Sequence, residues 1–290
     1  MKRTFILSLI AVAFILLLIG VAFSLSTFEE NPKPVVQDNS FKTREFSVNG
    51  VSFKMVAVEG GIFQMGATSE QQDPGPDEKP VHSVTLSNYY IGETEVTQAL
   101  WEAVMGTTIR DQAKKGTWST DLKGIGYNYP MYYISYDDCV AFVKKLNEKM
   151  KAEGQLPAGR EFRLPTEAEW EFAARGGNFS RGYQYSGSNT FSSVAWYRDN
   201  CNETTHPVKR KQANELGLYD MSGNVLEWCN DWYYDYSPSL QTNPKGPSTG
   251  SYRVLRGGCW RYNAQDCRVA SRISVSPDTR FNDSGLRLAL

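Results

Sequence analysis

The stretch Gly217–Trp228 constrains this chain most strongly, because it places two carboxylates around a sharp turn. It reads G-L-Y-D-M-S-G-N-V-L-E-W, with Asp220 and Glu227 on either side of Gly223-Asn224. A Gly-Asn pair allows positive φ and a tight reversal. Such a turn can aim backbone carbonyls and both acids inward, and a hard cation such as Ca²⁺ requires convergent oxygens of this kind. The alternative is a turn in a packed core, with Asp220 as a turn former and Glu227 in solvent.

The N-terminal residues 1–26 are predicted to be a targeting segment. Two positive residues precede Phe5–Leu25, which is almost unbroken apolar sequence. This run reaches the roughly 20 residues that a membrane-spanning helix needs, so it could be an uncleaved membrane anchor. Small residues within Ala22-Phe23-Ser24 also offer a cleavage site for a signal peptide. Both alternatives place the rest of the chain outside the cytoplasm, as a periplasmic, secreted or anchored protein.

Residues 27–43 are a polar, Pro-containing linker, and residues 44–290 are expected to form one domain. Apolar residues make up 41% of the 290-residue chain, which is enough to bury a sizeable core. The net charge of −1 gives no reason to expect nucleic acid or an anionic membrane surface as a partner. The chain contains neither a P-loop nor a dinucleotide-binding fingerprint.

The five cysteines suit an oxidising compartment without defining a disulfide framework. An odd number leaves at least one thiol unpaired or paired with another chain. A domain of this size does not need disulfides. We therefore expect most of them to be buried, inert thiols. They are Cys139, Cys201, Cys229, Cys259 and Cys267.

Several short strands are predicted in the first half of the domain. The apolar runs Phe53–Val58 and Ile62–Met65 flank Glu59-Gly60-Gly61, which predicts a β-hairpin. Val81–Leu86 alternates between apolar and polar residues, which predicts a strand, and Tyr89–Ile91 continues as an apolar run.

Three helices carry recognisable start signals. Thr97 can cap a helix that runs to Met105 and stops at Gly106. Ser135 opens a second helix, and Thr166 with Glu169 forms a capping box for a third. The second helix has one apolar stripe, made of Cys139, Phe142, Val143, Leu146 and Met150. A few helices, many short strands and long glycine-punctuated loops indicate an α+β fold with little regular secondary structure.

Several motifs in this order resemble those of the formylglycine-generating enzyme family, also called the sulfatase-modifying factor family. The resemblance covers about residues 51–290 and rests on the motifs at Glu59–Gly66, Glu93–Thr97, Arg163–Glu171, Gly217–Trp228, Arg253–Gly258 and Gly285–Arg287. It implies a compact single domain with a variant of the C-type-lectin-like fold. Well-known members oxidise a sulfatase cysteine to formylglycine, using O₂ and a copper ion that two cysteines hold.

The resemblance also implies structural Ca²⁺. One calcium site of the family maps onto the side chains of Asp220 and Glu227 and the carbonyls of Gly223 and Val225. Asp220 stands where the enzymes carry Asn, a change that keeps an oxygen ligand and adds charge. A second calcium site of the family does not carry over, because the segment near residues 194–200 is shorter and lacks the matching Asn.

The copper-binding pair is where the sequence departs from the family. Counted from the glycine pair that precedes them, the two cysteine positions fall on Tyr262 and Cys267, while Cys259 stands where the enzymes usually have Ser. Cys259 and Cys267 could therefore hold copper together, as the catalytic residues of an altered site. Otherwise Cys267 is a core cysteine, which could pair with Cys229. The iron-binding branch of the family is excluded within this chain, because its only histidines are His82 and His206.

Two hypotheses follow. In the first, the chain is an exported, calcium-stabilised domain that binds a protein or glycan partner and is not an oxidase. In the second, it is an oxidoreductase that converts the cysteine of an exported sulfatase to formylglycine with O₂ and copper. The missing thiol at Tyr262 favours the first, and the near-complete match elsewhere favours the second.

Overall fold

The computed structural model describes residues 43–116 and 121–290. The predicted targeting segment and all but the last residue of the predicted linker lie outside the described residues. The described part forms one α+β domain, as the sequence predicted, and its strands form three small sheets. Within these ranges, no helix combines the length and the apolar character needed to cross a membrane.

The first sheet has the order β1-β2-β5. Its strands are β1 (Thr43–Val48), β2 (Val51–Val58) and β5 (Tyr89–Gly92). β1 and β2 are joined by the pair Asn49-Gly50, whose φ angles are 49° and 80°. Positive φ at both central residues is the signature of the tight turns that suit twisted hairpins. The domain therefore begins with a hairpin that the sequence analysis had read partly as linker.

The hairpin predicted between residues 53–58 and 62–65 is wrong in its pairing. Both runs are strands, but β2 pairs with β1 and β5, whereas β3 (Ile62–Met65) pairs with β4 (His82–Thr85) in the sheet β3-β4-β7. The intervening Gly60 lies against the backbone of Leu86, where a Cβ atom would overlap the carbonyl oxygen. Gly60 thus allows the chain to pass close to the backbone that follows β4, while Gly61 lies against the side chain of Asn178, and the two residues do not form a hairpin turn.

The third sheet has the order β10-β6-β8-β9 and carries Glu227 of the candidate site on β6. Its strands are β6 (Leu226–Trp232), β8 (Arg253–Arg256), β9 (Arg272–Val275) and β10 (Ser284–Gly285), and the short strand β7 (Gln241–Thr242) belongs to the sheet of β3 and β4. β6 begins directly after the Gly223-Asn224 turn, so the sheet fixes the direction in which the turn residues point.

The predicted helices are confirmed, with their caps. Thr97, Ser135 and Thr166 each accept a hydrogen bond from the third residue of the helix that follows, and Gly106 ends the first helix with a φ of 74°. The helices are α2 (Gln98–Met105), α3 (Ile109–Ala113), α4 (Tyr136–Ala152), α5 (Glu167–Ala174) and α6 (Phe191–Val194), with 3₁₀ turns at Pro76–Glu78, Gly177–Phe179 and Ala264–Cys267.

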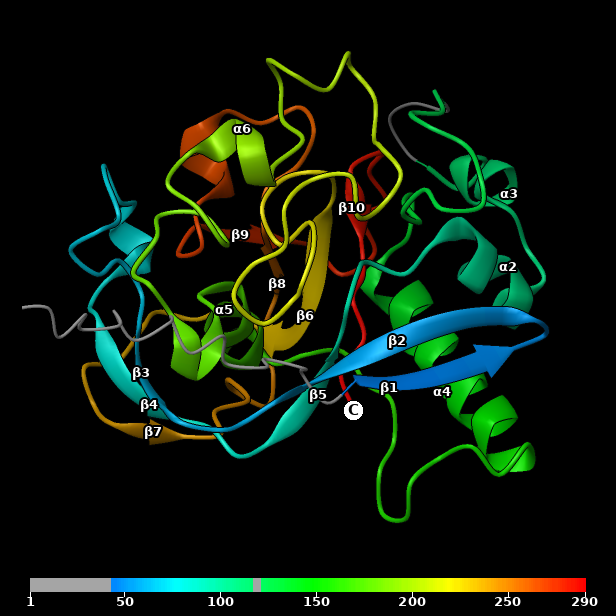
Figure 1. The fold of residues 1–290 in the computed structure, drawn as a ribbon, viewed down its shortest axis with the longest axis horizontal. Helices are drawn as coiled ribbons and strands as arrows, with labels where there is room; N and C mark the ends of the chain where they lie inside the picture. The colour runs from blue at the N-terminus through cyan, green and yellow to red at the C-terminus, as the bar shows by residue number, and fades with distance from the viewer. Residues whose placement is uncertain (1–42, 117–120) are drawn as a thin grey trace, which may run out of the picture. The chain divides into compact units, whose positions relative to one another are not determined.

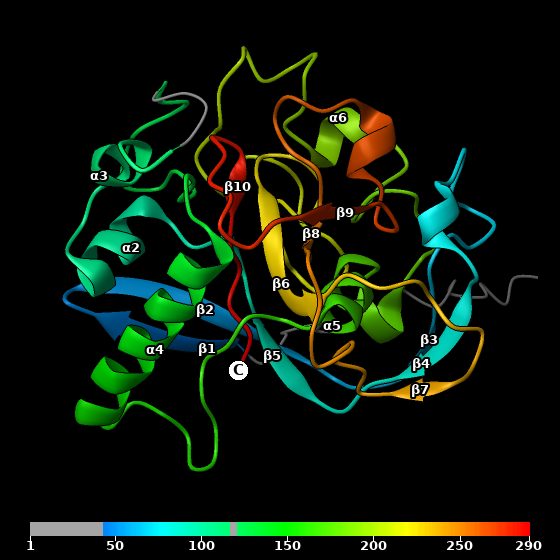
Figure 2. The same ribbon diagram turned by 180° about the vertical axis from the view of Figure 1, so that it is seen from behind.

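Two large hydrophobic clusters lie on opposite faces of the strands. Successive residues of a strand point to opposite faces, so Trp228 of β6 packs in one cluster and Cys229 in the other. α2 and α4 cover the first cluster and α5 covers the second, as the two opposite views show (Figures 1 and 2). The apolar stripe of α4 is buried as predicted, except that Val143 is only partly covered.

Candidate functional site

The turn at Gly223-Asn224 has the sharp geometry that the sequence predicted. Asp220, Gly223 and Asn224 have φ angles of 58°, 82° and 60°. The Asn224 N–H donates to the Trp196 carbonyl at 2.9 Å, and the Gly223 N–H donates to the Gly257 carbonyl at 2.8 Å. A Cβ atom at position 223 would overlap the carbonyl oxygen of Trp196, so this position requires glycine.

Glu227 is buried beside this turn, so the alternative that placed it in solvent is wrong. Only 1% of the residue is exposed. Its carboxylate accepts hydrogen bonds from Arg287 Nη2 at 2.7 Å and from Trp170 Nε1 at 2.7 Å. A charged guanidinium and an indole N–H together compensate the cost of burying this charge.

Asp220 is also buried but is incompletely paired. Its Oδ2 accepts from the Lys209 N–H at 2.9 Å, whereas its Oδ1 is buried and has no hydrogen-bond partner among the described residues. Burial raises the pKa of Asp220 to about 6, and the nearby Glu227 carboxylate also raises it. An orphaned carboxylate oxygen in the interior is costly unless a proton or a cation compensates it.

Glu95 completes the cluster, and the sequence analysis did not identify it as a site residue. It is buried, its Oε1 accepts from the Val225 N–H at 3.2 Å, and its Oε2 accepts from Asn224 Nδ2 at 2.9 Å. Burial raises its pKa well above the usual range, and the charges of Asp220 and Glu227 raise it further. Its only sequence signal was its place in the motif Glu93–Thr97, which gave family membership without a role.

The cluster gathers several carboxylate oxygens in the interior. Three buried carboxylates, Glu95, Asp220 and Glu227, share one guanidinium, Arg287. Among the described residues, no three side chains of His, Cys, Asp or Glu are grouped so that they alone could hold a metal. The predicted ligand set differs from such a group because it combines two side chains with the carbonyls of Gly223 and Val225. Asp220 Oδ1 is free to act as a ligand, whereas both Glu227 oxygens already accept from Arg287, and Oε2 accepts from Trp170 as well.

The two candidate catalytic thiols lie near each other but are sealed in the interior. Cys259 and Cys267 are both 0% exposed. Burial raises the pKa of Cys259 well above the usual range, and the Asp283 carboxylate raises it further, while the thiol donates to Asp283 Oδ2 at 3.5 Å. Burial also raises the pKa of Cys267, and the N–H groups of Cys259 and Gly223 offset only part of that effect.

Cys267 belongs to a small apolar cluster with Tyr185, Phe191 and Val194, against which Tyr262 packs. The 3₁₀ turn that contains Cys267 lies beside α6 in both views (Figures 1 and 2). The possible pairing of Cys267 with Cys229 is not formed, because Cys229 packs in a different cluster and all five cysteines are free thiols among the described residues. Their burial agrees with the expectation of inert core cysteines.

Comparisons with known proteins found a matching family model, related sequences and a similar solved structure. The model of the sulfatase-modifying factor enzyme 1-like domain matches residues 42–290. The chaperone protein LppX of Paenibacillus barcinonensis is 33% identical over 268 residues, which cover 82% of this chain and 89% of that protein. A formylglycine-generating enzyme of Streptomyces coelicolor is 32% identical over 293 residues, covering 81% of this chain and 88% of the enzyme. The solved structure of Treponema denticola variable protein 1 matches with a TM-score of 0.71 and 35% identity, covering 86% of this chain and 98% of that one.

Proposed function

Since the chain belongs to the sulfatase-modifying factor family, we propose that it is an exported, calcium-stabilised accessory domain that binds a protein partner and does not carry out the copper-dependent oxidation. The observation that carries this proposal is the environment of the thiols. Tyr262 stands at the first copper position, and both neighbouring thiols are completely buried.

Two physical arguments support a non-oxidase. Copper(I) is bound by thiolates, whereas burial and the Asp283 charge hold Cys259 in its neutral form. A peptide substrate must also reach the reacting sulfur, and neither sulfur is open to solvent. The residues present therefore fit copper poorly. A role in binding a protein is supported by the relative that is named a chaperone protein.

The test is a direct assay for oxidation. The copper-loaded protein is incubated in air with a peptide that contains Cys-x-Pro-x-Arg, and the peptide mass is then measured. We expect the thiol mass to remain, while the Streptomyces coelicolor enzyme, run in parallel, produces the aldehyde. Aldehyde formation by this protein that is lost in Cys267→Ser would overturn the proposal in favour of a formylglycine-generating oxidase.

Calcium at the Gly223-Asn224 turn is the second part of the proposal, supported by the orphaned Asp220 oxygen and the excess of buried carboxylates. A ligand that binds only the folded state stabilises it by about 2.7 kcal/mol at 100 times its Kd. For a domain of this size that amounts to a Tm increase of roughly 5–10 °C. We expect a chelator to lower the Tm by about this amount and added Ca²⁺ to restore it. An unchanged melting curve in excess chelator would contradict the site.

Variants can rank the predicted calcium ligands by how much each contributes to calcium affinity. Asp220→Asn keeps an oxygen at the position of the orphaned atom, whereas Glu227→Ala removes both carboxylate oxygens. Calcium titration calorimetry should therefore show a larger rise in Kd for Glu227→Ala than for Asp220→Asn. Equal affinities in both variants and the parent protein would place the calcium elsewhere.

Extracytoplasmic location is the third part and rests on residues 1–26, whose apolar run follows two positive residues. A fusion of the full chain to alkaline phosphatase, which is active only after export, tests it. We expect phosphatase activity from the full-length fusion and none after deletion of residues 1–26. An inactive full-length fusion would contradict export.

A further inference from the structure

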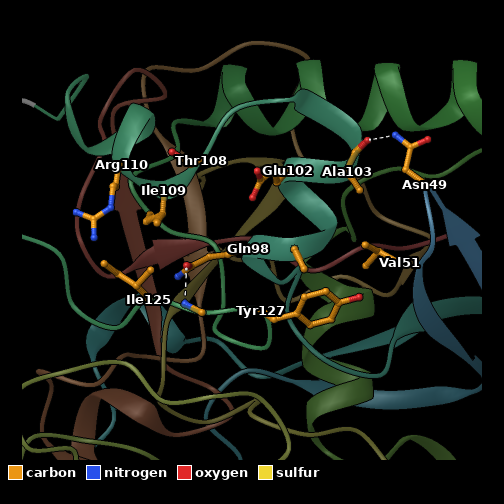
Figure 3. Close-up of a pocket in the computed structure, with 12 residues that line it drawn as sticks. Asn49, Val51, Gln98, Glu102, Ala103, Thr108, Ile109, Arg110, Ile125 and Tyr127 are labelled. Carbon is orange, nitrogen blue, oxygen red and sulfur yellow. Dashed lines mark hydrogen bonds between the residues drawn. The ribbon is translucent and has the colours of Figure 1, made fainter.

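A solvent-facing groove lies on the domain, and none of its lining residues belongs to the cluster of buried acids or to the buried thiols. Its volume is about 500 Å³, within the range of known ligand sites. The hairpin β1–β2, helix α2, the start of α3 and the loop 125–127 line it (Figure 3). The lining residues with prominent side chains are Asn49, Val51, Glu102, Ile109, Arg110, Ile125 and Tyr127.

The walls of the groove expose apolar side chains to solvent. Ile125 is 46% exposed and Tyr127 is 61% exposed, although both are large hydrophobic residues. Val51 is partly exposed in the same groove, whereas Ile109 lies at its floor and is only 4% exposed. Apolar side chains gathered in a groove, in contrast to single exposed ones, are typical of surfaces that a partner covers.

Two opposite charges line the groove, and neither has a side-chain partner among residues 43–116 and 121–290. Glu102 on α2 and Arg110 at the start of α3 are exposed, and neither makes an ion pair or a hydrogen bond through its side chain in the described part of the chain (Figure 3). Other acids nearby are engaged, since Asp111 pairs with Lys114. A ligand that matches this groove must therefore carry both a positive and a negative group.

The groove continues into a second hollow. That hollow has a volume of about 200 Å³ and shares Val51 and Tyr127 with the first. The second hollow is also lined by charged residues of both signs, Glu45, Lys54, Glu93, Glu95 and Lys209. Two adjoining hollows suit a chain that passes from one into the other better than a compact small molecule. Nucleic acid and anionic lipid present only negative groups, which Glu102 would repel.

We propose that this groove binds an extended peptide segment of a partner protein, which carries a basic side chain for Glu102, an acidic side chain for Arg110 and an apolar side chain for the surface of Ile125 and Tyr127. The inference rests on the proposed accessory function and names the surface by which the domain holds its partner. Apolar contact supplies affinity, while the two charges fix the direction of the bound segment.

The probe is a phage-displayed pool of random peptides about seven residues long, which span roughly 23 Å when extended. Peptides selected on the full chain are synthesised and their affinities measured by fluorescence polarisation. The groove variants are Glu102→Lys, Arg110→Glu and Ile125→Ser. Their matched controls, on exposed positions outside the groove, are Glu148→Lys and Lys144→Glu on α4 and Ile62→Ser on β3. Melting curves establish that each variant is folded.

We expect the selected peptides to combine a basic, an apolar and an acidic residue. Each groove variant should weaken binding at least about tenfold, since a like charge now faces the peptide or the apolar contact is lost. Replacing the basic peptide residue with Glu should restore binding to Glu102→Lys, and the control variants should bind as the parent protein does.

Three outcomes would overturn the assignment: no enriched peptide, equal affinities of the groove and control variants, or binding to anionic lipid vesicles that Arg110→Glu abolishes. These outcomes are separable from a failure of the proposed function. Groove variants that bind like the controls, together with an unreacted cysteine peptide, would remove the groove and leave the accessory function. Aldehyde formation would remove the accessory function whatever the peptide results are.

Discussion

Asp231 is a buried residue that contributes to the pH dependence of the stability of the domain. It lies on β6 and is almost fully buried, and its Oδ2 accepts from the Glu167 N–H at 2.9 Å. Burial raises its pKa to about 8, and the neighbouring Glu167 carboxylate adds to the shift. Between pH 4 and pH 8 the folded state therefore holds a proton that the unfolded state has released. Stability falls with rising pH wherever the folded state binds more protons.

We predict that Asp231→Asn flattens this dependence. The Asn oxygen can still accept from the Glu167 N–H, but no proton is bound or released. The parent protein should lose up to about 1.4 kcal/mol of unfolding free energy per pH unit in that window through this group. Urea unfolding at a series of pH values measures the slope. Asp235→Asn, at an exposed position on the same segment, is the control, and a slope in Asp231→Asn as steep as in this control would contradict the assignment.

The sequence predicted Asp220 and Glu227 as site residues but did not predict that Glu95 and Arg287 contact them. Asp220 and Glu227 flank one turn, so local spacing brings them together. Their partners come from far along the chain, because Arg287 is 60 residues from Glu227 and Glu95 is 129 residues from Asn224. No local pattern encodes such contacts. Family motifs marked both segments, but they did not say that these side chains meet.

For the helices and strands, local sequence signals predicted where each element lies along the chain better than they predicted which strands pair. The helix caps are contained within four residues, so the sequence reveals them. Strand pairing depends on tertiary packing, and the apolar runs of β2 and β3 join different sheets. The turn Asn49-Gly50 was a local hairpin signal that was overlooked in the sequence analysis, because the preceding run Thr43–Val48 has few apolar residues.

The helix caps also predict how much a single capping residue stabilises the domain. Thr166 Oγ1 accepts from the Glu169 N–H at 3.2 Å and so satisfies a free N–H group at the start of α5. Thr166→Ala should cost about 1 kcal/mol, which lowers the Tm by roughly 2–4 °C in a domain of this size. Thr190→Ala is the matched control, because Thr190 precedes α6 without a side-chain capping bond. Equal Tm losses in the two variants would show that the cap of α5 contributes nothing.

Across the whole domain, Arg287 joins segments that belong to different sheets. It is fully buried and binds Glu227 on β6, the Gly92 carbonyl on β5 and the Tyr219 carbonyl. β6 contributes alternate residues to both large hydrophobic clusters, and Trp170 of α5 binds the same Glu227 carboxylate. The ion pair therefore lies where the first sheet, the third sheet and α5 meet.

This position predicts that Arg287→Gln destabilises the entire domain in a single step. Removal of the guanidinium leaves Glu227 buried without its countercharge, which typically costs about 3–5 kcal/mol. Arg280→Gln removes a more exposed ion pair with Asp138 and should cost about 1 kcal/mol or less. Hydrogen exchange at the amides of β2 and β6 measures the loss of stability in each of the two variants. In Arg287→Gln we expect protection to fall equally in the two strands, because the two sheets share this residue. If β2 kept the protection of the parent protein while β6 lost its own, the sheets would unfold separately and Arg287 would stabilise only its local surroundings.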